Sequence, residues 1–330
     1  MQDVPRFKIK VFDGYCDDPD NTIDALTKFL EQETFVEIGF HGEAPALDQT
    51  YLGETKFIDK LKEICLQTKK EHSQVKIVSG NIIERKDIWP NLEMFYDDQH
   101  FLYGQTTTPN HKKAMHLKHF ALFVGVSRWP RLWLSCMLYN EHNNKSLLTF
   151  NADATNKNVD KDKMFAKCDS FNLSECFETF AKATPIRLQE RPVDHYFAHT
   201  DAYTLNEFYD RFFLELITES FHSGRTFCPT EKTARPILNK TPFIVQGPKD
   251  YLRNLQQLGF KTFSQFWPEY YDSYSGYDRL KEIKNVVDTI SSYSEERLLE
   301  MLEDMQGILD HNYKTYMQLK PLDMEYRLLS

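Results

Sequence analysis

The sequence predicts an α/β protein in which two doubly wound domains face each other across a cleft and C-terminal helices close the fold. Strand-like and helix-like hydrophobic patterns alternate along the chain in two series, and a polar segment separates the series. Beyond residue 277, apolar residues recur three and four positions apart, which is typical of long amphipathic helices. Alternating strands and helices build parallel sheets covered by helices. The 330 residues are enough for about two such domains.

The first series lies in a predicted N-terminal domain of residues 1–112. It starts at residues 7–12, where apolar and basic side chains alternate as in a strand. The next elements are a helix with Ile23, Leu26, Phe29 and Leu30 on one face, a strand at 35–40, a helix at 57–70 and a strand at 74–78. The polar, proline-containing stretch 104–113 is predicted to link the two domains.

The second series lies in a predicted domain of residues 113–285, which a helical segment of residues 286–330 follows. The predicted strands are 120–126, 147–150, 212–218 and 242–246, and the predicted helices are 128–140, 205–211, 230–238 and 251–258. Residues 151–167 are polar and poorly patterned, so a long surface loop is expected there. Ser294, followed by Glu295 and Glu296, predicts the start of a C-terminal helix.

Composition narrows the class of protein. The net charge of −9 argues against wrapping of nucleic acid, which depends on Lys and Arg neutralising phosphates, but it leaves room for a local basic pocket. The longest apolar run, residues 120–126, is too short to span a membrane. Because the N-terminus lacks the apolar core of a signal peptide, a cytoplasmic protein is expected. The six cysteines form no CxxC pair, which indicates reduced thiols.

Four common signatures are absent from the sequence, namely GxGxxG, GxxxxGK[ST], HExxH and GxSxG. Their absence argues against dinucleotide dehydrogenases, P-loop NTPases, zincins and α/β-hydrolases. His111, His116 and His119 lie within nine residues, but no Cys or acidic ligand is paired with them. We therefore expect a basic interdomain segment there rather than a zinc site.

The first candidate site is the start of the helix that follows Glu219. A loop containing Arg225 leads from Glu219 to Thr230, which stands where an N-cap belongs, and Glu231 and Lys232 occupy the first turn. The free amide groups and positive dipole end of such a helix bind phosphate. Lys232 opposes the dipole unless an anion is near, and Glu231 could accept hydrogen bonds from sugar hydroxyls. The alternative is a capped surface helix, with Glu231 favouring the dipole and Lys232 in water.

The second candidate site follows the predicted strand at 120–126. Arg128 and Arg131 lie at the carboxyl end of this strand, where ligands bind in open α/β sheets. Two guanidinium groups at this place could clamp a diphosphate with paired hydrogen bonds. The alternative is a surface turn in which the arginines stack on Trp129 and Trp133.

Together, the two sites resemble the nucleotide-binding half of the α-1,3-fucosyltransferase-like glycosyltransferases. They resemble still more closely a group of phage and environmental proteins related to that family. The resemblance covers roughly residues 118–270, with the same order and spacing throughout. The shared pattern consists of Arg128-Trp-Pro-Arg131, a strand ending at Glu219, Thr230-Glu231-Lys232, Pro236 with the strand 242–247, and GFKTF at 259–263.

The resemblance implies a GT-B fold, in which two Rossmann-like domains hold the nucleotide-sugar donor mainly on the C-terminal domain, with no obligatory metal. Carried over by position, Arg128 or Arg131 and Lys232 would neutralise the diphosphate. Glu231 would hold donor hydroxyls, and Glu219 would help to shape the donor pocket. Without a metal, such cations and a helix terminus must meet the charge of the leaving group.

A general base from the N-terminal domain is expected to deprotonate the acceptor hydroxyl. Glu43, in the loop after the predicted strand at 35–40, is the preferred candidate, and His41 is the second. The alternative is a structural turn built around Gly42 and Pro45.

The predicted function is therefore that of a metal-independent glycosyltransferase, an enzyme that moves a sugar from a nucleoside-diphosphate sugar to an acceptor hydroxyl. The acceptor is open, with a glycan, a small molecule and modified nucleic acid as candidates. The donor is a co-substrate, and no cofactor is predicted. One alternative is a non-catalytic nucleotide-sugar-binding protein on the same scaffold. Another is a protein-interaction module, in which Met301, Met305 and Ile308 would form an exposed face.

Overall fold

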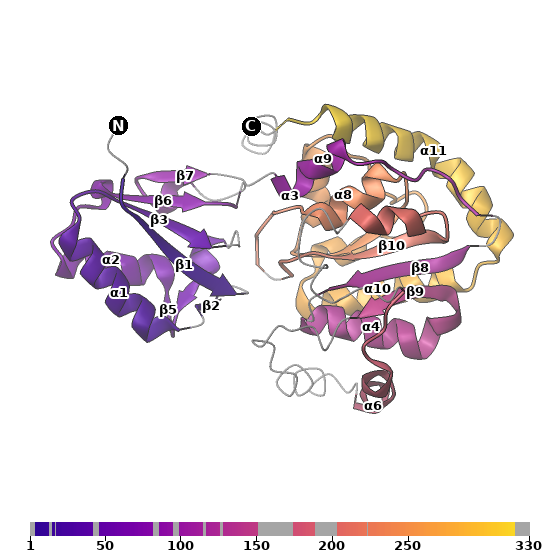
Figure 1. Ribbon diagram of the computed structural model, residues 1–330, viewed down its shortest axis with the longest axis horizontal. Coiled ribbons are helices and arrows are strands. Elements are labelled where there is room, and N and C mark those ends of the chain that lie inside the picture. Colours follow the sequence, from indigo (N-terminus) through magenta and orange to yellow (C-terminus); the bar gives the residue numbers. More distant parts are fainter. Residues whose placement is uncertain are drawn as a thin grey trace. The chain divides into compact units, whose positions relative to one another are not determined.

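The computed structural model describes the chain in two compact units, each containing helices and parallel strands (Figure 1). The described residues are 4–12, 15–16, 18–41, 46–81, 86–94, 99–114, 117–125, 128–150, 174–188, 203–222 and 224–320. The first unit comprises residues up to 97 together with 223–228, and the second comprises 98–222 and 229–320. The predicted α/β class is confirmed.

The strands and α-helices of the described residues have the following bounds. The strands are β1 (Arg6–Phe12), β2 (Tyr15–Cys16), β3 (Val36–His41), β4 (Tyr51–Leu52), β5 (Thr55–Lys56), β6 (Val75–Ser79), β7 (Leu92–Met94), β8 (Lys118–Val124), β9 (Ser146–Phe150), β10 (Phe212–Thr218) and β11 (Phe243–Gln246). The helices are α1 (Pro19–Gln32), α2 (Phe57–Gln67), α3 (Gln99–Leu102), α4 (Trp129–His142), α6 (Ser174–Ala183), α8 (Glu231–Leu238), α9 (Tyr251–Gln257), α10 (Gly276–Ser291) and α11 (Glu295–Gln318).

The first unit is built on a sheet with the strand order β5-β4-β2-β1-β3-β6-β7. Strands β1, β3, β6 and β7 are parallel, whereas β2 and β5 pair antiparallel with β1 and β4. Its core includes Ile9 and Ile38 of the sheet, Leu26 and Leu30 of α1, and Leu61 of α2. The predicted strands 7–12, 35–40 and 74–78 are thus confirmed as β1, β3 and β6. The sequence did not predict β2, β4, β5 or β7, because two or three residues are too few to show an alternation.

The second unit contains a fully parallel sheet with the order β11-β10-β8-β9. All residues of β10 and β11 are buried, as expected for parallel strands covered on both faces. Glu215 of β10 pairs with Arg235 of α8, so the odd-numbered residues of β10 face α8. Phe120 of β8, which is aligned with Leu214, contacts His142 of α4, so the opposite face of the sheet is the α4 face. Helix α11 packs against α8, and helix α10 packs against α4 (Figure 1).

Helices α4 and α10 run in the same direction along their face of the sheet. Trp133 and Tyr277, near the two N-termini, have ring centroids 6.1 Å apart. Near the two C-termini, His142 Nε2 lies 2.9 Å from Asp288 Oδ1. Because α4 follows β8 directly, the N-termini of both helices lie at the carboxyl end of the sheet.

The predicted linker at 104–113 belongs to the second unit instead of joining two domains. Gln105 Nε2 donates to the carbonyl oxygen of Tyr316 at 2.5 Å, and Lys113 Nζ donates to that of Tyr209 at 2.6 Å. The segment is polar because its side chains satisfy backbone carbonyl groups. The structure accordingly divides the chain after residue 97, whereas the sequence placed the division after residue 112.

Two helix predictions need correction, and one is confirmed. The helix expected at 205–211 is a 3₁₀ helix over Tyr203–Phe208, followed by a turn into β10. The expected C-terminal segment starting at 286 cuts through α10, and both last helices belong to the second unit. Ser294 caps α11 as predicted, since its Oγ accepts a hydrogen bond from Arg297 N at 3.3 Å.

The surface loop expected at 151–167 lies outside the described residues. In the described part of the chain, no helix combines the length and apolar character that crossing a membrane requires. Met301 and Met305 of α11 are buried. The interaction-module alternative required them to be part of an exposed face.

Candidate functional site

The topology of the second sheet makes the edge between β8 and β10 the candidate site for a ligand. These two strands are neighbours, but the chain leaves β8 through α4 on one face to reach β9, and leaves β10 through α8 on the other face to reach β11. A crevice forms where neighbouring connections diverge in this way, and ligands of open α/β sheets bind there, outside the carboxyl ends of the strands. Both predicted sites lie in the two segments that leave this edge.

Glu219 is the central buried group of this edge. It directly follows β10, and its residue is 2% exposed. Oε1 accepts hydrogen bonds from Thr230 N at 3.0 Å, Thr233 Oγ1 at 2.6 Å and Tyr251 OH at 3.1 Å. Oε2 accepts from Thr230 Oγ1 at 2.7 Å and from Ser220 N at 3.2 Å. With five donors around it, the carboxylate fixes the first turn of α8 against the end of β10.

Gly247 allows Tyr251 to reach Glu219. A β-carbon on Gly247 would lie 3.1 Å from Cδ2 of the Tyr251 ring, closer than side chains normally pack. The glycine in the strand pattern 242–247 therefore has a packing role: it leaves room for the ring whose hydroxyl holds the carboxylate.

The start of α8 agrees with the sequence prediction. Thr230 is the N-cap, and its Oγ1 accepts a hydrogen bond from Lys232 N at 3.3 Å. Lys232 Nζ lies 2.5 Å from Glu231 Oε1 and 3.3 Å from Thr230 Oγ1. Burial alone would raise the pKa of Glu231, but the Lys232 ammonium group outweighs it and lowers the pKa to about 2. Glu231 is thus the anion that balances Lys232.

The start of α4 supplies two arginines to the same edge. Arg128 is the N-cap residue, without a capping hydrogen bond from its side chain, and the first turn contains no acidic residue. Arg128 donates to the carbonyl oxygen of Ser220, and Arg131 Nη2 donates to that of Glu219 at 3.2 Å. Arg131 is buried. The first turn of α4 therefore brings positive charge to the end of β10.

The rings expected to stack on these arginines in the alternative interpretation have other contacts. Trp129 lies against His222, with centroids 5.5 Å apart, and Trp133 lies against Tyr277. His222 and Tyr277 thereby become part of the surroundings of the α4 N-terminus, which the sequence had not indicated.

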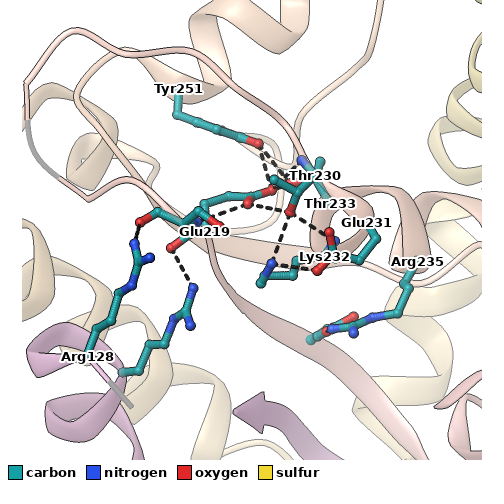
Figure 2. Close-up of polar contacts among 11 residues, drawn as sticks. Arg128, Glu219, Thr230, Glu231, Lys232, Thr233, Arg235 and Tyr251 are labelled. Atoms are coloured by element: carbon teal, nitrogen blue, oxygen red, sulfur yellow. Dashed lines mark hydrogen bonds and ion pairs between the residues drawn. The ribbon is translucent and has the colours of Figure 1, made fainter. Parts of the chain in front are cut away.

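Six of the predicted site residues therefore lie together at this edge, and five of them are labelled in Figure 2. They are Arg128, Arg131, Glu219, Thr230, Glu231 and Lys232. Arg225 is not among them, because residues 223–228 belong to the first unit, where its guanidinium group pairs with Asp48. Glu43 and the side chain of His41 lie outside the described residues.

The three histidines singled out in the sequence do not form a shared site among the described residues. His111 Nε2 lies 2.9 Å from the carbonyl oxygen of Leu238, and His119 Nε2 lies 2.9 Å from that of Tyr293. Burial lowers the pKa of His119, against a smaller opposite effect of that hydrogen bond. His116 lies outside the described residues.

Three side chains of types that can bind a metal ion lie together at the α4–α10 contact. Within the described ranges, Glu141, His142 and Asp288 bring ligand atoms within 4.8 Å of one another. Lys284 pairs with both carboxylates, so an ammonium group already meets their charge.

Sequence reasoning missed the residues that hold Glu219 in place, Thr233 and Tyr251. It also missed Gln246, whose carbonyl oxygen accepts from Glu219 N at 2.9 Å. The one signal in the sequence for Gln246 was its position at the predicted end of the strand 242–246. The last residues of neighbouring parallel strands lie at the same edge of a sheet, so Gln246 could have been placed near Glu219.

No protein-family model matches this chain, and no curated protein matches it significantly. The fold and the site define its class so far: an α/β protein with a cationic sheet edge, at which two helix N-termini approach one buried carboxylate.

Proposed function

We propose that this protein is a glycosyltransferase whose nucleoside-diphosphate sugar donor binds at the carboxyl edge of the second sheet. One observation carries the proposal: the N-termini of α4 and α8 meet at the divergence of β8 and β10, with Arg128, Arg131 and Lys232 beside them. Helix N-termini and guanidinium groups are the usual protein ligands of phosphate. The two α/β units support the proposal as well, since a GT-B enzyme consists of two.

Binding of the diphosphate would exchange ionic partners at the start of α8. Lys232 would leave Glu231 for a phosphate oxygen, and the freed Glu231 carboxylate would accept hydrogen bonds from hydroxyl groups of the sugar. While it is paired with Lys232, this carboxylate is ionised at neutral pH, because its pKa is about 2. Two arginines, a lysine and two helix termini would meet the charge of the departing nucleoside diphosphate without a metal ion.

Calorimetry with nucleoside diphosphates in EDTA tests the donor site. At 100 times its dissociation constant, a nucleotide is expected to stabilise the protein by about 2.7 kcal/mol. Lys232→Ala is expected to abolish binding, whereas the control Lys314→Ala, at an exposed position of α11, is expected to bind normally. Failure of every nucleotide to bind would refute the proposal, and binding by Lys232→Ala equal to that of the control would refute the site.

Release of free sugar from the donor separates an enzyme from a non-catalytic nucleotide-sugar-binding protein. An enzyme is expected to hydrolyse its donor slowly even without an acceptor, and Glu43→Gln and His41→Gln test which group of the first unit acts as the base. Donor binding with neither hydrolysis nor transfer to glycans, small molecules or nucleic acid would favour the binding protein. The interaction module has less support, because Met301 and Met305 are buried.

A further inference from the structure

Gln246 ends β11 and points toward the face of the sheet that α4 and α10 cover. It is aligned with Thr218 of β10, one residue before Glu219, so its side chain lies on the face opposite to that of Glu219. Glu219 is on the α8 face, where it meets Thr233. The side chain of Gln246 is therefore at the carboxyl edge on the side where the N-termini of α4 and α10 lie.

The carboxamide of Gln246 is buried without a hydrogen-bond partner. The residue is 1% exposed, and neither Oε1 nor Nε2 has a partner among the described residues. Native proteins pair nearly all buried polar groups, because an unpaired one loses its hydrogen bonds to water without replacement. A glutamine lacking partners at both of its polar atoms is therefore explained most simply by a group that binds there.

A second unpaired polar group lies near the same helix ends. Trp133 of α4 is 3% exposed, and its Nε1 has no hydrogen-bond partner in the described structure. Its ring contacts Tyr277 in the first turn of α10. Two residues further along α10, Arg279 Nη2 donates to the carbonyl oxygen of Val245 at 2.9 Å, next to Gln246. The first turns of α10 thus connect the surroundings of Trp133 with those of Gln246.

We propose that Gln246 binds the base of the donor nucleotide and determines which base is accepted; this inference rests on the proposed function. The transferred sugar has to remain accessible to an acceptor, whereas the base leaves with the diphosphate and can be enclosed. The base is therefore the part of the donor that suits a buried carboxamide, and its entry has to displace the protein atoms that cover Gln246. The hydrogen-bonding edge of a nucleobase carries a donor and an acceptor side by side, and a carboxamide complements such a pair.

Two variants at Gln246 test the proposal, with inorganic pyrophosphate as a probe that lacks the base. Gln246→Met keeps the length of the side chain and removes both polar atoms, and Gln246→Glu removes only the donating group. Gln257→Met, at an exposed position of α9, is the control. Dissociation constants are measured for pyrophosphate and for the diphosphates of uridine, guanosine, adenosine, cytidine and thymidine.

Wild-type protein is expected to prefer one base, and Gln246→Met is expected to weaken binding of that nucleotide about tenfold or more, since a lost buried hydrogen bond costs that order of affinity. Binding of pyrophosphate is expected to stay unchanged. Gln246→Glu is expected to change the ranking of the bases. Gln246→Met is also expected to unfold at a higher temperature than wild type without ligand, because it no longer buries an unpaired amide.

The outcomes separate the inference from the proposed function. If neither nucleotides nor pyrophosphate bind to the wild-type protein, the proposed function fails. If nucleotides bind and Gln246→Met leaves both their affinities and their ranking unchanged, the proposed function stands and the role of Gln246 is refuted. Equal weakening of pyrophosphate and nucleotide binding would likewise refute it, because it would assign Gln246 a general structural effect.

Discussion

Glu219→Gln is the substitution that best tests how the candidate site is held together. The glutamine can keep one oxygen in the place of Oε1, where it accepts from Thr230 N, Thr233 and Tyr251. Its amide nitrogen then takes the place of Oε2, opposite Ser220 N, which is a donor. The Thr230 hydroxyl also loses its acceptor. Two charge-assisted hydrogen bonds disappear, each worth about 1.5–3 kcal/mol, so a loss of stability of about 3–6 kcal/mol is expected.

The assay combines urea unfolding with hydrogen exchange read at individual amides. The amide of Ser220 is expected to exchange faster in Glu219→Gln, because it donates to the oxygen that the amide nitrogen replaces, whereas the amide of Thr230 keeps its acceptor. Glu303→Gln, at an exposed position of α11, is the control and is expected to behave like wild type. If Glu219→Gln matched that control in both stability and exchange, the carboxylate would not be what fixes the first turn of α8.

Three further predictions concern ionisable side chains of the second unit. Arg235→Met leaves Glu215, its partner at 2.8 Å, as an unpaired buried charge, so urea unfolding is expected to show a loss of about 3–5 kcal/mol, and Arg235→Met with Glu215→Leu is expected to recover part of it. Burial lowers the pKa of Lys113 to about 7, so above pH 7 the unfolded chain binds more protons than the folded protein. The free energy of unfolding therefore rises from pH 7 to 10, by at most about 1.4 kcal/mol per pH unit. Lys113→Met is expected to lose this rise, and an unchanged slope in the variant would contradict the prediction. Burial raises the pKa of Glu269 to about 7, so between pH 4.5 and 7 the folded protein binds more protons than the unfolded chain. The free energy of unfolding therefore falls across that range. Glu269→Gln is expected to reduce this fall in unfolding curves measured from pH 4.5 to 7.

The sequence predicted best those parts of the second unit where local pattern and tertiary packing agree. Residues 212–218 are apolar but for one glutamate and one threonine, and they form β10 within the predicted bounds. Thr230 was identified as an N-cap because capping depends on neighbouring residues alone. The sequence identified both segments that form the site, the starts of α4 and α8, because each follows a strand with a strong hydrophobic pattern.

Contacts between distant residues were predicted poorly, because they leave no periodic signal. The sequence pattern assigned Gln105 and Lys113 to a linker. It could not show their carbonyl acceptors, some of which are about two hundred positions away. Arg225 was assigned to the phosphate site by its place in the chain, but its segment packs in the first unit. Gln246 carried no signal of its own, since an unpaired amide is recognised only when its surroundings are known.

The passage of residues 224–228 through the first unit affects how the protein can be synthesised and divided. Ala46 N donates to Thr226 Oγ1 at 3.0 Å, and Phe227 N donates to Asn81 Oδ1 at 3.2 Å. The partners are 180 and 146 positions apart, so most of the second unit leaves the ribosome before the first can be completed. The first unit is therefore unable to finish folding as the chain emerges, and a fragment ending at residue 97 lacks a piece of its own interior. Both units have to be produced as one polypeptide, or with residues 224–228 supplied separately.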